Sequence, residues 1–107
     1  MGSLIVYVWP GSKQGKNVVN LKIPAAFRKY TDHEPELALD VSSLSEALEV
    51  LFDKYPDVKQ HVVSADGQIR RFINIYVNQD DVRLLNGINT DLKTGDNIRI
   101  VPAIAGG

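Results

Sequence analysis

The sequence SLSEALEVLFDKYP, at residues 43–56, carries the clearest helical pattern in the chain. Ser43 followed by Glu46 has the form of a capping box, in which the serine hydroxyl accepts a first-turn amide hydrogen and the glutamate reaches back to the cap. A helix is therefore expected to begin at this serine and to end before Pro56, which cannot continue it. One stripe of the helix is apolar and comprises Leu44, Ala47, Leu48, Leu51, Phe52 and Tyr55. This stripe is expected to pack on a sheet.

Short runs of alternating apolar residues flank this helix and predict strands. Residues 19–23 and 36–41 precede the helix and are suited to pairing as a hairpin. Residues 72–78, 82–85 and 97–101 follow it, after a looser segment at 57–71. Two strands, a helix and three strands predict an α+β roll with a mixed sheet packed on one main helix. Among such rolls we choose the β-grasp, although another α+β roll fits the same pattern.

The two faces of the predicted sheet differ in chemistry. Ile73, Ile75 and Val77 share one face of their strand, and Ile98 and Ile100 alternate in the last strand, so these residues are expected to form the core. The opposite face is predicted to bind partner proteins through Phe72, Tyr76, Arg99 and Val101.

Composition narrows the class of protein. The chain has 107 residues, of which 44% are hydrophobic and 23% charged, as expected for one globular domain. A formal net charge of −1 argues against binding to nucleic acid or to an acidic membrane. The absence of cysteine excludes disulfides, Cys-based metal sites and a cysteine nucleophile. The apolar run at residues 4–9 is too short for a membrane span or a signal-peptide core, so a cytoplasmic location is expected.

Other motifs predict little chemistry. Residues 11–16 resemble a phosphate-binding loop but lack its spacing, with three residues between the glycines, and Asn17 replaces the magnesium-binding Ser or Thr. His33 and His61 are isolated, so no metal site is predicted. Asp80 and Asp81 are interpreted as turn formers. A basic and aromatic set suited to stacking on single-stranded nucleic acid is disfavoured by the net charge and comprises Arg70, Arg71, Phe72, Tyr76 and Arg99.

Three segments are expected along the chain. Residues 1–16 form an N-terminal extension, whose first three residues have the composition of an expression-tag remnant. Within it, residues 4–9 would either add an edge strand or cover one. Residues 17–102 form the domain, and residues 103–107, Ala-Ile-Ala-Gly-Gly, form a flexible tail. At an average glycine usage of about 7%, two final glycines occur by chance in roughly 0.5% of chains. An inert tail therefore remains an alternative at this point.

The ending resembles a known family. Residues 92–107, LKTGDNIRIVPAIAGG, resemble the end of the MoaD/ThiS ubiquitin-like sulfur carriers, with a leucine, Gly-Asp, an apolar strand, proline and final Gly-Gly. Residues 71–78 and 81–83 are most similar to the carrier associated with a cysteine synthase. The similarity runs from about Val19 to Gly107 and includes Ile23-Pro24 and Arg28, whereas the extension departs from the family pattern.

The resemblance implies a carrier, not an enzyme. It implies that the Gly107 carboxylate, next to Gly106, is adenylated by an E1-like enzyme with ATP and converted to a thiocarboxylate. No cofactor is expected on the chain itself. The sulfur acceptor implied is a cysteine-synthase-like enzyme, followed by a metalloprotease that releases the product, with no nucleic-acid or membrane partner. The predicted partner-binding residues are Phe72, Tyr76, Arg99, Val101, Pro102, Ala103, Ile104 and Ala105.

Three alternatives remain open from the sequence. The first is a ubiquitin-like modifier that joins Gly107 to protein lysines. The second is a sulfur donor subunit for molybdopterin or thiamine synthesis. The third is a protein-binding domain with an inert tail.

Overall fold

The computed structural model describes residues 6–8 and 17–103. Its strands are β1 Val6–Val8, β2 Val18–Lys22, β3 Glu36–Asp40, β4 Ile73–Val77, β5 Asp80–Asp81 and β6 Asn97–Pro102. They form one six-stranded sheet in the order β1-β3-β2-β6-β4-β5. The β1–β3 and β2–β6 pairs are parallel, and the remaining pairs are antiparallel. The predicted mixed sheet is confirmed, including the β2–β3 hairpin pairing.

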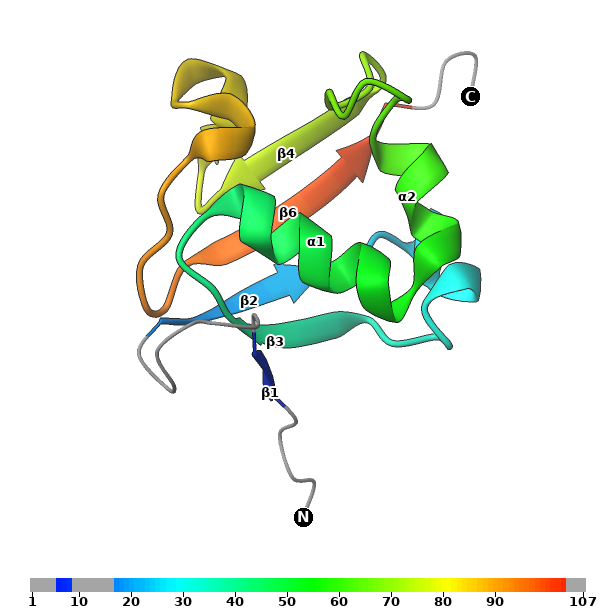
Figure 1. Cartoon of the computed structure of the whole chain (residues 1–107), viewed down its shortest axis with the longest axis horizontal. Coiled ribbons are helices and arrows are strands. Elements are labelled where there is room, and N and C mark those ends of the chain that lie inside the picture. Colours follow the sequence, from blue (N-terminus) through cyan, green and yellow to red (C-terminus); the bar gives the residue numbers. More distant parts are fainter. Residues whose placement is uncertain (1–5, 9–16, 104–107) are drawn as a thin grey trace.

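The main helix, α1 Leu44–Lys54, lies where the capping pattern predicts it and crosses one face of the sheet (Figure 1). The Ser43 hydroxyl accepts the Glu46 amide hydrogen at 3.2 Å. The glutamate carboxylate accepts the Ser42 amide hydrogen at 2.8 Å, one residue before the predicted partner. These bonds satisfy the backbone amides of Ser42 and Glu46, which have no partner within the helix, and so favour the start of the helix at Leu44.

The core lies between this helix and the inner face of the sheet. The predicted helical stripe is buried throughout, as are Ile73, Ile75, Ile98 and Ile100 in the sheet. Burial of each larger aliphatic side chain contributes about 1.5–3 kcal/mol to stability. The predicted division of the sheet into a core face and an outer face is therefore confirmed for β4 and β6.

Residues 57–71 are less irregular than the sequence suggests. A second helix, α2 Pro56–Val62, follows α1 directly and covers the same side of the sheet (Figure 1). Pro56 ends the first helix but occupies the first position of the second, where its missing amide hydrogen costs nothing. Val58 and Val62, four residues apart, are fully buried and fix this short helix to the core.

The prediction of a strand at 82–85 is wrong. The first three of these residues form a 3-10 helix, η2 Val82–Leu84. The Asp81 carboxylate caps it by accepting the Arg83 amide hydrogen at 2.9 Å. This bond confirms the turn-forming role predicted for Asp81, whereas the same prediction is wrong for Asp80, which lies in a strand after the turn at residues 78–79. The sheet instead gains the two-residue strand β5. Two further 3-10 helices, η1 Ala25–Tyr30 and η3 Gly87–Asn89, were not predicted by the alternation pattern.

Part of the N-terminal extension joins the sheet. Strand β1 pairs in parallel with β3, with Val6 opposite Ala38 and Val8 opposite Asp40. This observation favours the edge strand over the alternative of an edge cover. Because β1 lies at the edge beyond β3, two strands separate it from β6, which leads to the C-terminal residues.

Candidate functional site

The last strand places the end of the domain at the middle of the sheet. Strand β6 lies between β2 and β4, and its carboxyl end lies beside the start of β4 (Figure 1). Pro102 is the register partner of Ile73, and the Ala103 amide donates to the Phe72 carbonyl at 2.6 Å. We call these last paired residues, Pro102 and Ala103, the tail root. The tail root is therefore held by pairing with the β4 side, whereas the pairing of β6 with β2 ends at Arg99.

A row of polar side chains crosses the outer face next to this point. Lys22 of β2, Arg99 of β6 and Tyr76 of β4 are register partners on three adjacent strands. The Arg99 guanidinium lies 5.2 Å from the centre of the Tyr76 ring, in a cation–π contact. We call these three residues the outer row. Lys22 and Arg99 make this side of the tail root basic, and the Tyr76 ring adds an aromatic surface.

A small hollow runs along the ends of β2 and β6 toward the tail root. It has a volume of about 250 Å³ and is lined by Lys22, Ile23, Pro24, Arg99, Ile100, Val101 and Pro102. The lining is largely apolar between the two cations, and Val101 and Pro102 are half-buried. Such a surface can bind an apolar side chain flanked by acidic groups of a partner protein.

The structure brings together part of the predicted partner-binding set. Tyr76, Arg99, Val101 and Pro102 lie together on β4 and β6, and Ala103 is exposed at the tail root. Phe72 is 60% exposed and lies just before β4, beneath the Arg71 guanidinium at 6.0 Å. The other predicted site residues, Ile104, Ala105, Gly106 and Gly107, lie outside the described residues, as does the loop-like motif at 11–16.

Two residues near the tail root were missed by the sequence analysis. Lys22 is exposed at the end of a predicted strand, but only the parallel β2–β6 pairing places it beside Arg99. Arg83 follows β5, and its guanidinium donates to the Asn74 side chain and to the Ile73 carbonyl, both at 2.6 Å. Lys22 could be found only from the pairing of strands far apart in the sequence, and Arg83 only from the fold of the turn that returns it to the start of β4.

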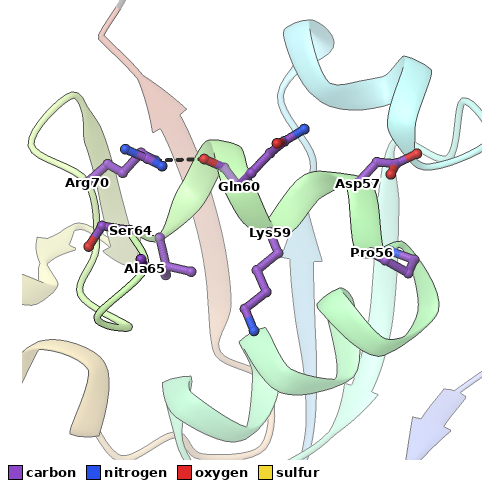
Figure 2. Close-up of a pocket in the computed structure, with 8 residues that line it drawn as sticks. Pro56, Asp57, Lys59, Gln60, Ser64, Ala65 and Arg70 are labelled. Atoms are coloured by element: carbon purple, nitrogen blue, oxygen red, sulfur yellow. Dashed lines mark hydrogen bonds between the residues drawn. The ribbon is translucent and has the colours of Figure 1, made fainter.

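A second hollow, of about 410 Å³, lies over α2 and the following turn (Figure 2). Its charged side chains do not converge: Arg70 turns to the Gln60 carbonyl, while Lys59 and Asp57 extend in different directions. In the adjoining turn, hydrogen bonds from the Ser64 hydroxyl and then from the Gln68 amide hold the pKa of Asp66 below its ordinary value. This carboxylate thus serves the turn, and we assign the hollow no ligand.

The described residues carry no metal-binding arrangement. Within residues 6–8 and 17–103, no group of three or more His, Cys, Asp or Glu side chains is placed to hold an ion. His61 instead stacks on Tyr30, with ring centres 4.7 Å apart. Of the basic and aromatic set, Arg70 directs its guanidinium to α2, where its Nε donates to the Gln60 carbonyl. In the same part of the chain, no helix is long and apolar enough to cross a membrane.

Comparison with known proteins identifies the family. The model of the ThiS family matches residues 21–107, which include the whole of β6, the tail root and both final glycines. The chain belongs to the ThiS family. Residues 1–20, including β1, lie outside this match.

Individual relatives agree with this assignment. The sulfur carrier protein CysO of Mycobacterium tuberculosis is 33% identical over 91 residues, which cover 83% of this chain and 98% of CysO. The crystal structure of the BexX/CysO complex of Amycolatopsis orientalis contains a chain with a TM-score of 0.77 and 32% identity, covering 83% of this chain and 99% of that one. These findings confirm the predicted family, the β-grasp fold and the sulfur-carrier function. Carriers of this type are small and are not themselves catalysts, as the resemblance implies.

A third relative bears on the alternative function. The small archaeal modifier protein 1 of Methanosarcina acetivorans has a TM-score of 0.72 and 32% identity, covering 86% of this chain and 98% of that one. A protein modifier and sulfur carriers thus have the same fold at similar identity to this chain.

Proposed function

We propose that this ThiS-family chain carries sulfur as a thiocarboxylate on Gly107. In the first step, a carboxylate oxygen attacks the α-phosphorus of ATP in a partner enzyme, forming an acyl adenylate and releasing pyrophosphate. In the second step, a sulfur nucleophile at the oxidation level of sulfide attacks the acyl carbon and expels AMP. Activation is needed because a carboxylate with a pKa near 3.5 is ionised at neutral pH and is a poor electrophile.

The observation that carries this proposal is the place of the final glycines in the sequence, five residues or fewer after β6 and inside the family match. The family match includes both of them, and they follow the central strand β6 at the tail root. Five residues beyond Pro102 extend about 17 Å, enough to bring a carboxylate into a buried site while the domain stays outside. Glycine has no β-carbon, so the last two residues suit a narrow channel.

The proposed destination of the sulfur is cysteine. The similarity to CysO, a sulfur carrier protein, supports this assignment over molybdopterin or thiamine synthesis. The partners proposed are an E1-like adenylating enzyme, a cysteine-synthase-like acceptor and a metalloprotease that releases the new cysteine. ATP is used by the adenylating enzyme, and no cofactor is proposed on the carrier itself.

The outer row is proposed to bind the adenylating enzyme, together with Phe72 and Val101. Charge reversal by Arg99→Glu places a carboxylate beside Tyr76 and Lys22 and removes the cation–π contact. We expect affinity for the enzyme to fall at least about tenfold, or 1.4 kcal/mol. Melting should change little, because an exposed cation–π contact contributes only about 0.5–1 kcal/mol. Titration calorimetry and thermal melts measure the two effects.

A matched control makes the same charge reversal at a position far from the outer row. Lys93→Glu reverses an exposed cation in the loop before β6, at the opposite end of that strand from the tail root, and should leave affinity unchanged. Unaltered binding of a double variant, Arg99→Glu with Tyr76→Ala, would remove the outer row from the proposed interface.

The second candidate function is protein modification through Gly107, favoured by the similarity to small archaeal modifier protein 1. Both functions begin with the same adenylate and differ in the nucleophile that attacks it. A carrier gains one sulfur in place of one oxygen, whereas a modifier forms an amide with a lysine side chain.

Intact-mass analysis of the protein from its own cell distinguishes these two outcomes. We expect a species whose mass exceeds that of the chain ending at Gly107 by the difference between sulfur and oxygen. Treatment with an alkylating reagent should add one group, because the chain has no cysteine to compete for it. Lysine-linked conjugates without any thiocarboxylate would contradict the carrier proposal.

A further inference from the structure

The tail root depends on a single β-turn at residues 70–73. The Ile73 amide donates to the Arg70 carbonyl at 3.0 Å, which closes the turn. Phe72 lies inside this turn, and its carbonyl accepts the Ala103 amide hydrogen. The position of Ala103, at the end of the described residues, is therefore linked to the conformation of this turn.

One side of the turn lies at an unpaired edge of β4. Carbonyls along a strand alternate between its two edges, so the Ile73 carbonyl points away from β6 when that of Phe72 points toward it. Strand β5 pairs only with Tyr76 and Val77 and does not reach this part of the edge. A backbone carbonyl left without a partner here would need water or a side chain.

The Arg83 guanidinium supplies that partner. One nitrogen donates to the Ile73 carbonyl at 2.6 Å and lies 3.4 Å from the Arg70 carbonyl, so it contacts both ends of the turn. The other terminal nitrogen donates to the Asn74 side chain at 2.6 Å. The planar guanidinium suits this set of three acceptors, which a lysine ammonium cannot match with the same geometry.

The contacts of Arg83 are directional and do not rest on its charge. Its ion pair with Asp81 is 3.8 Å long and partly exposed to solvent, so the pair contributes little. The Arg70 side chain is directed to α2, where its Nε donates to the Gln60 carbonyl at 2.7 Å (Figure 2). The turn is thus held to α2 on one side and to Arg83 on the other.

We propose that Arg83 is a positioning residue, which fixes the turn at 70–73 and so the direction in which the C-terminal residues leave the tail root. It acts through Phe72 and Ala103 and contacts none of the reacting atoms. Its effect on sulfur loading rests on the proposed function, whereas its effect on the tail root is a property of the isolated domain.

The test begins with the protein alone. In Arg83→Met, which keeps an apolar stem but removes the hydrogen-bond donors, hydrogen exchange at the Ala103 amide should accelerate about tenfold in NMR measurements. Exchange at the Leu48 amide in α1 should stay unchanged, which distinguishes local loosening from global unfolding. Unchanged exchange at Ala103 in a folded variant would overturn the inference.

Kinetics with the adenylating enzyme provide a second measurement. The outer row is intact in Arg83→Met and only Phe72 of the proposed docking surface lies in the loosened turn, so the KM for the carrier should rise by no more than about threefold while kcat falls about tenfold. Arg83→Lys, which can restore one contact only, should give an intermediate kcat. A rise in KM with unchanged kcat would show instead that Arg83 belongs to the docking surface.

Two controls complete the design. Asp81→Asn removes the ion pair but keeps a side-chain oxygen for the η2 cap, so both exchange and kcat should match those of the natural chain. Loss of kcat in Asp81→Asn would assign the effect to charge and overturn the inference. If the natural chain is not loaded at all but Ala103 exchange still rises in Arg83→Met, the proposed function fails and the positioning role stands.

Discussion

Deletion of Gly107 is expected to abolish ATP-dependent sulfur loading while the domain stays folded. The new terminus at Gly106 would stop one residue short, about 3.3 Å from its proper place. Reacting atoms must approach to about 3–3.5 Å, so this shortfall is comparable with the whole contact distance. The free energy of unfolding should change by no more than about 0.5 kcal/mol, as for surface changes away from special features. Pyrophosphate release, intact mass and thermal melts measure these effects.

A substitution at the same position separates chain length from residue type. Gly107→Ala keeps the carboxylate at the correct reach and adds only a methyl group, so loading should fall but remain measurable. Full loading of the deletion variant would show that the carboxylate does not have to stand at Gly107, and would contradict the reach argument.

Local signals in the sequence predicted most of the elements that support this chemistry. The α1 helix was predicted from a serine cap, an apolar stripe and a proline, all of which act over a few residues. The buried faces of β4 and β6 followed from alternation for the same reason. Pro56 misled the prediction only because one residue serves both as the stop of α1 and as the first residue of α2.

Contacts between distant segments were harder to predict. The alternation at 82–85 suggested a strand, but a side-chain bond from Asp81 at the preceding position selected a 3-10 helix. That helix brings Arg83 to the start of β4, ten residues earlier in the chain. Likewise, Lys22 reaches Arg99 only through parallel pairing of strands far apart in sequence. Propensity and periodicity contain no information about such pairs.

On the proposed function, the domain and its C-terminal residues make separable contributions, with stability in the inner layer of the domain and the chemistry at Gly107. Strand β6 joins them, because Ile98 and Ile100 are buried in the core while Arg99 is exposed. A variant that damages only the inner layer provides the counterpart of the Gly107 deletion.

Leu48→Ala is expected to destabilise the domain by about 2–5 kcal/mol, the usual cost of truncating a buried leucine. Leu48 is 1% exposed and lies in the middle of the buried stripe of α1, where neighbouring helix and strand residues limit collapse of the cavity. For a domain of this size the melting temperature should fall by about 10 °C or more. Glu49→Ala, an exposed change in the same helix, should alter stability by no more than about 0.5 kcal/mol.

Below its melting temperature, Leu48→Ala should still be loaded with sulfur at the natural rate. The reason is geometric: α1 covers the inner face of the sheet (Figure 1), whereas the outer row lies on the opposite face and the tail root lies at the carboxyl end of β6. Denaturant titration and loading assays on the same sample test both halves of this expectation. Reduced loading by the folded variant would mean that the helical layer also contacts the adenylating enzyme, and that recognition is not confined to the outer face.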